Sequence, residues 1–414
     1  MSGNGLALLT QDDRLRRSLE RRAKTLDHVT IQCASTLETF ESMARSPSTT
    51  AILLDAKGLG AALWPTIDTL VKTAQKREIP ILLLEDGDMK VDQPRALEAG
   101  ISEIVARTAR LPVLLKTLER FHRFELYFWG VRGTLPVSGR HTLKYGGSTS
   151  SISLRMGSDR HFIFDAGTGL RNLSRYLMRK ESGHFNGRLF ITHPHWDHLN
   201  CIPFFEPLYN PKNQIHLMGP AHEGISFQKL LEGQMNGVYF PIKPDQFQAE
   251  VTYVDTEAGS FRYDGIKVEA FRLDHPGCCL GYRIEHAGAS IAYITDNELR
   301  AEDRSLASWG ALVEFLKDVD FLIHDASYFD DEYEARIHWG HSSVGQVVEL
   351  ALAASVKQLF LFHHDPEHSD TDIDAKWVEA ERHVAQNKGQ LICHNAREGE
   401  IWDLVAGRRK GSVR

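Results

Sequence analysis

Three histidines and an aspartate fall within six consecutive residues of this chain, His193-Pro194-His195-Trp196-Asp197-His198. The apolar residues 189–191 before them predict a strand that ends where the cluster begins. Side chains two apart in an extended chain point the same way, and a tightening turn would swing His198 toward the others. Imidazoles and a carboxylate suit zinc, iron or manganese. The spacing predicts His193 and His195 on one metal ion, and Asp197 and His198 on a second. A histidine-rich surface turn, the alternative, would better suit a bare pair of histidines.

Later predicted strands also end in histidine or aspartate. Residues 266–273, 290–295, 321–325 and 359–362 read as strands, and the polar residues at or just beyond their ends are His275, Asp296, His324, Asp325, His363 and His364. Any one of these would more often be a cap or turn residue. Because the strands would deliver all of them to one edge of a sheet, a shared metal site explains them better. His275 is expected to be the third ligand of the ion held by His193 and His195, and Asp296 to bridge the two ions.

The composition restricts the class of protein. At 414 residues, 42% hydrophobic and 25% charged, the chain has material for two to three globular domains. A net charge of −7 argues against a general nucleic-acid or membrane-surface binder, because anionic phosphates favour basic partners. Five scattered cysteines form no disulfide framework and fit a reducing compartment. With no secretion signal and no apolar run of about 18 residues, we expect a soluble cytoplasmic protein.

Short apolar strands alternate with amphipathic helices over residues 1–122. The predicted strands are 6–9, 29–32, 51–54, 79–84 and 103–106, and the predicted helices are 13–24, 37–44, 64–76, 94–99 and 112–123. This alternation is typical of a parallel, doubly wound α/β sheet. Five strands in this order, with Asp55 after the third, resemble the flavodoxin-like receiver domain of response regulators.

The departures from the receiver pattern outweigh the matches. Where receivers keep an acidic metal-binding pair this chain has Thr10 and Gln11, and Glu85 and Arg107 stand at the switch and lysine positions. A shifted alignment could place Asp12 and Asp13 at the positions of the acidic pair, but Glu85 would still repel a phosphoryl group on Asp55. We therefore predict a degenerate receiver that serves as a docking or dimerising module, with an ordinary strand-end role for Asp55 as the alternative.

Residues 124–404 resemble the metallo-β-lactamase-fold hydrolases, because the ligand motif and the later strand-end residues follow in that family's order. Four further motifs are similar to its phosphodiesterase and tRNase Z-like branch: Asp165-Ala-Gly-Thr-Gly, Ile323-His-Asp-Ala, Gly340-His341-Ser342 and Leu361-Phe-His363. The resemblance implies an αββα sandwich over residues 123–414 and two divalent metal ions, zinc first, with manganese or iron as alternatives. Asp165 is expected to orient a loop beneath the site.

The resemblance also implies a role for each site residue. One metal ion would take His193, His195 and His275, the other Asp197, His198 and His363, with Asp296 between them. A hydroxide bridging the ions would attack phosphorus, and Asp197 would orient it or receive its proton. His341 is the expected proton donor to the leaving group, with His324 in reserve. His364 rivals His363 but has the opposite parity on its strand.

Three functions remain open at this stage. The leading hypothesis is hydrolysis of a small cyclic phosphate, most simply a cyclic nucleotide of the cAMP or cGMP type. A tRNase Z-like ribonuclease is the alternative, although the net charge makes a nucleic-acid substrate less favoured. A di-iron redox or oxygen-sensing protein comes third, because such relatives usually carry glutamate where His195 stands. The resemblance further implies a homodimer, and the receiver-like domain a signalling partner. Residues 238–242 could line the active-site cleft or pack as a small satellite core. Cys278 and Cys279 are expected to be small buried residues.

Overall fold

The structure is a computed structural model that describes residues 4–24, 29–77, 79–87, 90–157, 160–263, 265–300 and 307–413. The chain divides into two compact units, Met1–Arg123 and Phe124–Arg414, and each is described by itself below. The division falls one residue beyond the predicted domain border at 122. Among the described residues every helix is too short or too polar to cross a bilayer.

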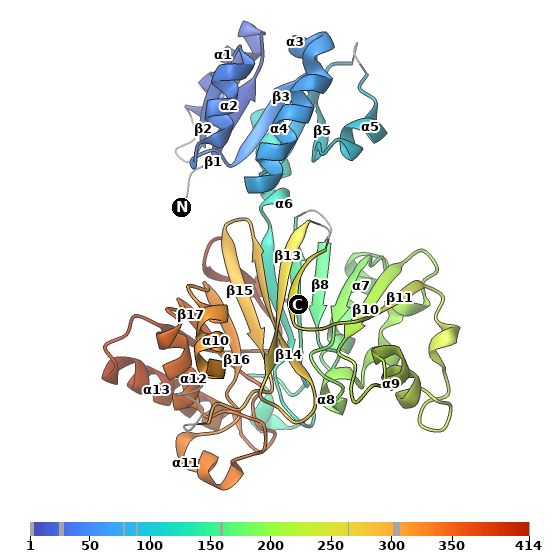
Figure 1. The fold of residues 1–414 in the computed structure, drawn as a ribbon, viewed down its shortest axis with the longest axis vertical. Helices are drawn as coiled ribbons and strands as arrows, with labels where there is room; N and C mark the ends of the chain where they lie inside the picture. Colours follow the sequence, from blue (N-terminus) through green and yellow to red (C-terminus); the bar gives the residue numbers. More distant parts are fainter. Residues whose placement is uncertain are drawn as a thin grey trace. The chain divides into compact units, whose positions relative to one another are not determined.

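The first unit is built on a five-stranded parallel sheet in the order β2-β1-β3-β4-β5 (Figure 1). Its strands are β1 Asn4–Leu9, β2 Val29–Ala34, β3 Ala51–Asp55, β4 Ile81–Glu85 and β5 Glu103–Ala106. Its main helices are α1 Asp13–Ala23, α2 Leu37–Arg45, α4 Leu63–Arg77, α5 Gln93–Glu98 and α6 Leu111–Phe121, and α3 Ala56–Leu59 is a single turn. This strand order is that of the flavodoxin-like doubly wound sheets.

Both faces of this sheet are apolar because helices cover both. Leu6 and Leu8 of β1 pack with residues of α1 and α6. Ala7 and Leu9, which point to the opposite face, pack with residues of α2, α4 and α5. The predicted parallel, doubly wound α/β unit is therefore confirmed. Element boundaries differ from the prediction by at most two residues, and β5 matches it at both ends.

The Asp55 carboxylate is fully buried at the end of β3 and is bonded within the unit. Thr10 Oγ1 donates a hydrogen bond to Asp55 Oδ2 over 2.6 Å, and Arg107 Nε donates to Asp55 Oδ1 over 2.7 Å. Arg107 Nη2 also donates to Asp12 Oδ2 over 2.6 Å. This guanidinium holds the pKa of Asp12 down at about 2, through its hydrogen bond above all. Arg107 therefore supplies the positive charge that a buried carboxylate requires.

We expect Arg107→Ala to destabilise the first unit by roughly 3–5 kcal/mol, because it leaves the buried Asp55 carboxylate without its counter-charge. Chemical denaturation followed by circular dichroism would measure the change. Arg110→Ala, which removes an exposed arginine three residues on, is the matched control. Equal stability of the two variants would show that Arg107 does not compensate Asp55.

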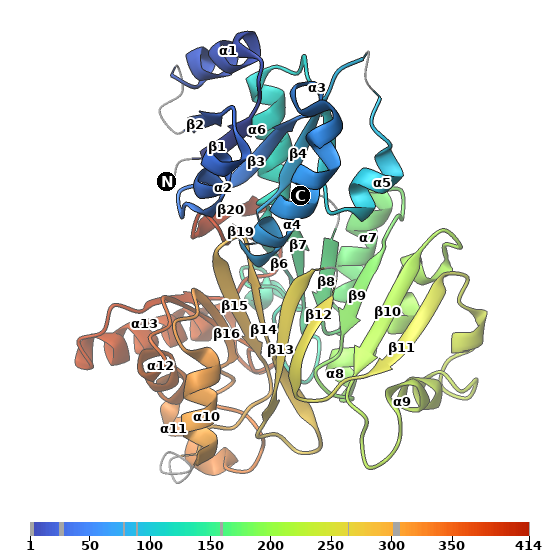
Figure 2. The same cartoon turned by 45° about the horizontal axis from the view of Figure 1, so that its top comes forward.

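The second unit consists of two sheets with helices outside them (Figures 1 and 2). An eight-stranded sheet has the order β11-β10-β9-β8-β7-β6-β19-β20, and a seven-stranded sheet has the order β12-β13-β14-β15-β16-β17-β18. The first sheet comprises β6 Phe124–Gly130, β7 Ser151–Met156, β8 Arg160–Phe164, β9 Gly187–Phe190, β10 Gln214–Gly219, β11 Glu250–Asp255, β19 Glu400–Asp403 and β20 Arg408–Ser412. The second comprises β12 Gly259–Tyr263, β13 Ile266–Leu273, β14 Cys279–His286, β15 Ala289–Ile294, β16 Phe321–Asp325, β17 Gln358–Phe362 and β18 Ile392–Asn395.

Three apolar clusters separate four layers. The central cluster joins the inner faces of both sheets, with Phe128 and Phe164 from one sheet and Tyr282 and Phe360 from the other. The outer face of the first sheet packs on α7 Leu170–Lys180 and α9 Phe227–Gln234, and that of the second on α10 Ala307–Leu316, α12 Val344–Ala353 and α13 Asp370–Gln386. The predicted αββα sandwich is confirmed, and its layering sends the ends of β9, β13, β15, β16 and β17 toward one site.

Candidate metal centre

The predicted ligands converge from four parts of the chain. The loop after β9 carries His193 and His195, and the short helix α8 Trp196–Leu199 carries Asp197 and His198. His275 follows β13, and Asp296 and His363 follow β15 and β17. The structure divides them into two groups of possible metal ligands, and Asp296 belongs to both. These are the seven residues that the sequence singled out as metal ligands.

The first group brings together His193, His195, His275 and Asp296. His195 Nδ1 lies 2.9 Å from His193 Nε2 and 3.1 Å from His275 Nε2. Asp296 Oδ2 lies 3.6 Å from His193 Nε2 and 3.8 Å from His275 Nε2. Two ligand atoms at about 2.0–2.1 Å from a tetrahedral ion are themselves about 3.4 Å apart, so these separations are close to those of a zinc site.

The second group brings together Asp197, His198, His363 and the other oxygen of Asp296. His198 Nε2 lies 3.1 Å from both Asp197 Oδ2 and Asp296 Oδ1. His363 Nε2 lies 3.3 Å from Asp197 Oδ2 and 3.1 Å from Asp296 Oδ1. Asp296 therefore turns one carboxylate oxygen toward each group, as a bridging ligand does.

The hydrogen bonds of the imidazoles leave the required nitrogens free for metal. His198 Nδ1 lies 2.9 Å from Asp165 Oδ2, and His275 Nδ1 lies 2.9 Å from the Gly340 carbonyl, so each of these nitrogens carries the proton and donates it. His363 Nδ1 lies 3.2 Å from Ser327 Oγ. In each ring the Nε2 lone pair then points toward the ligand group, an arrangement found in metal-binding histidines.

Two further observations fit bound cations. His198 Nε2 is buried and makes no hydrogen bond within the described residues, although two carboxylate oxygens lie 3.1 Å away. Burial lowers the pKa of His193, His195 and His275, and neutral imidazole is the form that binds metal. At His198 burial also opposes the charge, but Asp197, Asp296 and Asp165 outweigh it and raise the pKa. These carboxylates therefore create a site that favours positive charge.

Asp165 organises the ligand loop from below. Its Oδ1 accepts hydrogen bonds from the Thr192 backbone N–H and hydroxyl, and its Oδ2 accepts from the Tyr293 hydroxyl and from His198. Asp165 is absent from both ligand groups. These contacts agree with the expected orienting role, and they extend it to the ring of a ligand.

Several site residues hold strained backbone. Asp165, Asp296 and His363 have φ angles of 60°, 40° and 57°, in the left-handed region that non-glycine residues rarely adopt. Thr134, with φ of 60°, donates its backbone N–H to Asp197 Oδ2 over 2.8 Å. Strain of this kind clusters at functional sites because the surrounding packing must maintain it. Sequence reasoning missed Thr134, since its contact depends on a loop more than sixty residues before Asp197.

His341 lies beside the second ligand group. Its ring stacks on that of His363 with centroids 4.9 Å apart, and its Nδ1 lies 2.7 Å from Asp325 Oδ2. Burial alone would lower the pKa of His341, but the Asp325 carboxylate, followed by Asp296 and Asp197, raises it to about 9. The sequence singled out the strand that carries Asp325, but gave Asp325 itself no role.

His324 and His364 lie outside the ligand groups. His324 Nδ1 lies 2.7 Å from the Asp325 carbonyl, and its Nε2 lies 3.4 Å from the Asn297 amide. His364 Nε2 lies 3.1 Å from the Ala396 carbonyl. These contacts suit His324 to holding β16 in place, and they place His363 rather than His364 toward the metal ligands.

The structure also locates the two adjacent cysteines and the aromatic segment 238–242. Cys279 is buried behind the site with its Sγ 3.6 Å from His193 Nδ1, whereas Cys278 is half-buried. Residues 238–242 pack only in part. Val238 and Tyr239 are exposed, while Phe240 and Ile242 pack against the outer core of the first sheet.

The comparisons agree with this architecture. A family described as "Beta-lactamase superfamily domain" matches residues 160–364. This match, with the four layers, shows that the second unit has the metallo-β-lactamase fold. Ribonuclease Z of Archaeoglobus fulgidus is 26% identical over 292 residues, covering 59% of this chain and 89% of the relative. The chain is thus related to metallo-β-lactamase-fold proteins that include ribonuclease Z.

Two solved structures are similar to parts of the chain, with TM-scores below 0.5. The metallo-β-lactamase fold protein YhfI from Bacillus subtilis is 14% identical, with a TM-score of 0.49, over 67% of this chain and 99% of that one. The receiver domain of the sensor histidine kinase PA1611 from Pseudomonas aeruginosa PAO1 is 18% identical, with a TM-score of 0.25, over 28% of this chain and 96% of that one.

We expect Asp165→Asn to weaken metal binding by about 10- to 100-fold, because partners that orient metal-binding histidines typically contribute that much. Competition with a chromophoric zinc chelator would measure the affinity. Asp331→Asn, which removes an exposed carboxylate elsewhere in the unit, should bind zinc as the native chain does. Unchanged affinity in Asp165→Asn would mean that His198 does not depend on Asp165 for its orientation.

Proposed function

We propose that the second unit is a phosphodiesterase with two divalent metal ions. The observation that carries the proposal is the pair of ligand groups that share Asp296, next to a histidine held by a second carboxylate. His193, His195 and His275 would hold one ion, and Asp197, His198 and His363 the other, with Asp296 between them. Zinc fits the nitrogen-rich donor set best, and manganese and iron are the alternatives.

Two bound cations would supply an acidified water and would neutralise the charge of a phosphoryl group. The protein contributes the remaining chemistry through its own side chains. Asp197, fixed by the Thr134 N–H, has a carboxylate oxygen in the second group that can accept a proton from the attacking water. Because attack on phosphorus also needs a protonated leaving oxygen, a proton donor must face Asp197 across the site.

His341 fits the role of that donor. Its Nδ1 is occupied by Asp325, so its Nε2 is the nitrogen that can give a proton to the leaving oxygen. The carboxylate keeps the ring protonated and fixes its orientation, much as an aspartate orients a catalytic histidine in other hydrolases. His324, whose ring nitrogens face Asp325 and Asn297, is retained only as a reserve candidate.

A small cyclic phosphate, such as a cyclic nucleotide, is the substrate we propose first. Trp196 lies between His195 and Asp197 and is 81% exposed, and Trp339, two residues before His341, is 62% exposed. Large exposed aromatic side chains that are close in sequence to the site residues are suited to stacking on a planar base. They favour a substrate that carries a nucleobase over a simple alkyl phosphate.

Cleavage of RNA is the second candidate, and the relatives favour it. Ribonuclease Z proteins are 26% identical to this chain in Archaeoglobus fulgidus and 27% identical in Thermoplasma acidophilum. The net charge of −7 favours the small substrate, because an extended RNA backbone would require a basic surface. Homodimer formation and a signalling partner for the first unit accompany both candidates as proposals.

The deciding experiment is hydrolysis of a matched panel by metal-replete protein. The panel contains 3′,5′-cyclic AMP and GMP, their 2′,3′ isomers, bis-p-nitrophenyl phosphate and a precursor tRNA. Asp197→Ala, purified in parallel, exposes any contaminating activity. Turnover of a cyclic nucleotide by the native protein alone would establish the first candidate, and cleavage of the tRNA alone would establish the second. Inactivity on the whole panel by protein with two bound irons would replace both with a redox or oxygen-sensing function.

We expect His341→Ala to retain its metal but to lose about 10²- to 10⁴-fold in kcat on a substrate with a poor leaving group. Bis-p-nitrophenyl phosphate, whose leaving group needs little protonation, should be affected much less. Metal content by mass spectrometry and rates on both substrates test this. His184→Ala removes an exposed histidine as the control. A full rate with the poor leaving group would remove His341 from the mechanism.

We expect Trp196→Leu and Trp339→Leu each to raise the KM for a nucleotide substrate by about 5- to 100-fold, because stacking on a base is lost. The KM for dimethyl phosphate, which has no ring to stack, should stay the same if that diester is turned over. Val378→Ala, at a site 60% exposed on α13, is the control. Unchanged nucleotide KM values in both tryptophan variants would contradict base stacking at this rim.

A further inference from the structure

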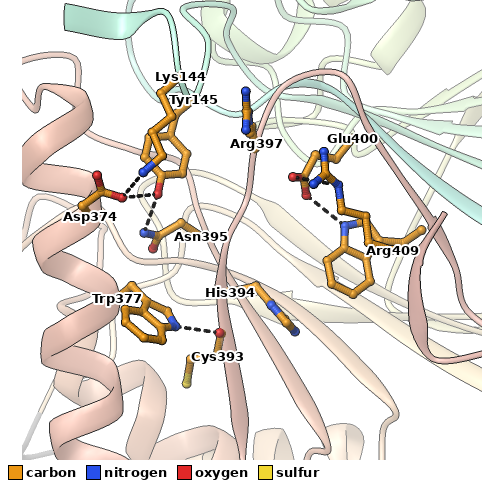
Figure 3. Close-up of a pocket in the computed structure, with 11 residues that line it drawn as sticks. Lys144, Tyr145, Asp374, Trp377, Cys393, His394, Asn395, Arg397, Glu400 and Arg409 are labelled. Atoms are coloured by element: carbon orange, nitrogen blue, oxygen red, sulfur yellow. Dashed lines mark hydrogen bonds and ion pairs between the residues drawn. The ribbon is translucent and has the colours of Figure 1, made fainter. Parts of the chain in front are cut away.

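A second hollow in the same unit is lined by residues that the metal centre does not use. Four separate segments surround a volume of about 380 Å³ (Figure 3). Helix α13 contributes Asp374 and Trp377, and the segment that includes β18 contributes Cys393, Asn395 and Arg397. The hairpin β19–β20 and the loop before β7 contribute the rest, which includes Glu400, Arg409, Lys144 and Tyr145. The volume falls in the range of roughly 300–1,000 Å³ that is usual for small-molecule sites.

The carboxylates of this hollow are already neutralised. Asp374 accepts hydrogen bonds from Lys144 and from the Tyr145 hydroxyl. Glu400 pairs with Arg409 over 3.2 Å and accepts a hydrogen bond from Trp402 Nε1. Each negative charge therefore has a positive or polar partner inside the hollow, and neither carboxylate is left to repel an incoming anion.

Arg397 differs from the other charged residues of the hollow. It is half-buried, and within the described residues its guanidinium has no ion-pair or hydrogen-bond partner. In Figure 3 it stands apart from the ion pairs, with no dashed line reaching it. A guanidinium presents a planar set of donors that matches the oxygens of a phosphate. Arg397 is thus available to bind an anionic group.

Trp377 supplies a planar apolar surface to the same hollow. It is 45% exposed although its Nε1 donates a hydrogen bond to the Cys393 carbonyl over 3.0 Å, which holds the indole in place. An exposed indole in a fixed orientation can stack on a heterocycle at little entropic cost. His394 is not a competing cation, because burial lowers its pKa to about 4 and keeps it neutral.

We propose that this hollow binds a phosphorylated planar heterocycle, of which a nucleoside monophosphate is the simplest example. Arg397 binds the phosphate and Trp377 stacks on the ring. Binding here does not depend on hydrolysis at the metal centre, so it can be measured in protein whose substrate is unknown.

The loop that carries Tyr145 also reaches the metal centre. The Tyr145 ring lies edge-on to His364, with centroids 5.9 Å apart, and His364 adjoins the ligand His363. Arg132 Nε donates to the Gly146 carbonyl, and Gly133 N–H donates to the His364 carbonyl. The next residue, Thr134, donates to Asp197. A ligand that contacts Tyr145 would therefore lie on the loop that donates hydrogen bonds to the proposed metal ligand Asp197 and to His364, the neighbour of His363.

The test is calorimetric titration of the full metal-replete chain with AMP, with adenosine and inorganic phosphate as partial probes. We expect Arg397→Ala to weaken AMP binding by about 10- to 100-fold, because a charge-assisted hydrogen bond to phosphate is lost. Trp377→Leu should weaken it by about 5- to 100-fold through loss of stacking. Arg408→Ala, an exposed arginine of β20 that does not line the hollow, is the matched control and should bind AMP normally.

Asp197→Ala separates this hollow from the metal centre. AMP binding that persists in Asp197→Ala and falls in Arg397→Ala supports the proposal, whether or not the panel of phosphodiesters is hydrolysed. AMP binding that is lost in Asp197→Ala but unchanged in Arg397→Ala would place the nucleotide at the metal centre and overturn it. Absence of AMP binding to native protein that shows a normal circular dichroism spectrum would overturn it as well.

Discussion

The two carboxylate oxygens of Asp296 hold the metal centre together. Each oxygen faces a different group of ligands, so the position of one side chain sets the relation between both groups. Asp296 is buried at the end of β15, and its backbone is held at a φ of 40°. Such a conformation costs free energy, and it persists only because β14 and β16 pair with β15 on either side and fix the end of the strand. The packed sandwich therefore stabilises a strained residue whose side chain joins the two groups.

A layer of hydrogen-bonded partners determines which ring nitrogen three of the candidate histidine ligands present to the metal groups. Asp165, Gly340 and Ser327 take the Nδ1 side of His198, His275 and His363. These partners come from both sheets and from the loop before α12, so the ligand geometry depends on the whole sandwich rather than on the ligand motif alone. At His341 one partner likewise serves two purposes, because the Asp325 carboxylate both orients the ring and raises its pKa. Protonation and orientation are thus controlled by the same contacts.

The first unit has a common α/β topology, but the partners of its strand-end aspartate differ from those in a receiver domain. Its strand order is that of flavodoxin-like sheets, and Asp55 ends the third strand as expected. Thr10 and Arg107 occupy both oxygens of that carboxylate, so a positive side chain stands where receivers would need a divalent cation. Thr10 and Gln11 led us to predict a unit without an acidic metal-binding pair, but the sequence did not predict the ion pair between Arg107 and Asp55.

The sequence indicated the approximate strands and the strand-end residues among which the candidate ligands lie, because periodicity of two or 3.6 and residues placed at strand ends are local properties. The αββα layer order and the complete ligand set came from the resemblance to a family. Strands β5, β13 and β16 were predicted to the residue. Only the tertiary structure decided which oxygen of Asp296 faces each group, that Asp325 orients His341, and that Thr134 holds Asp197. It also created the hollow around Arg397 and Trp377. These features depend on contacts between residues up to about 250 positions apart, and such contacts leave no periodic pattern in the chain.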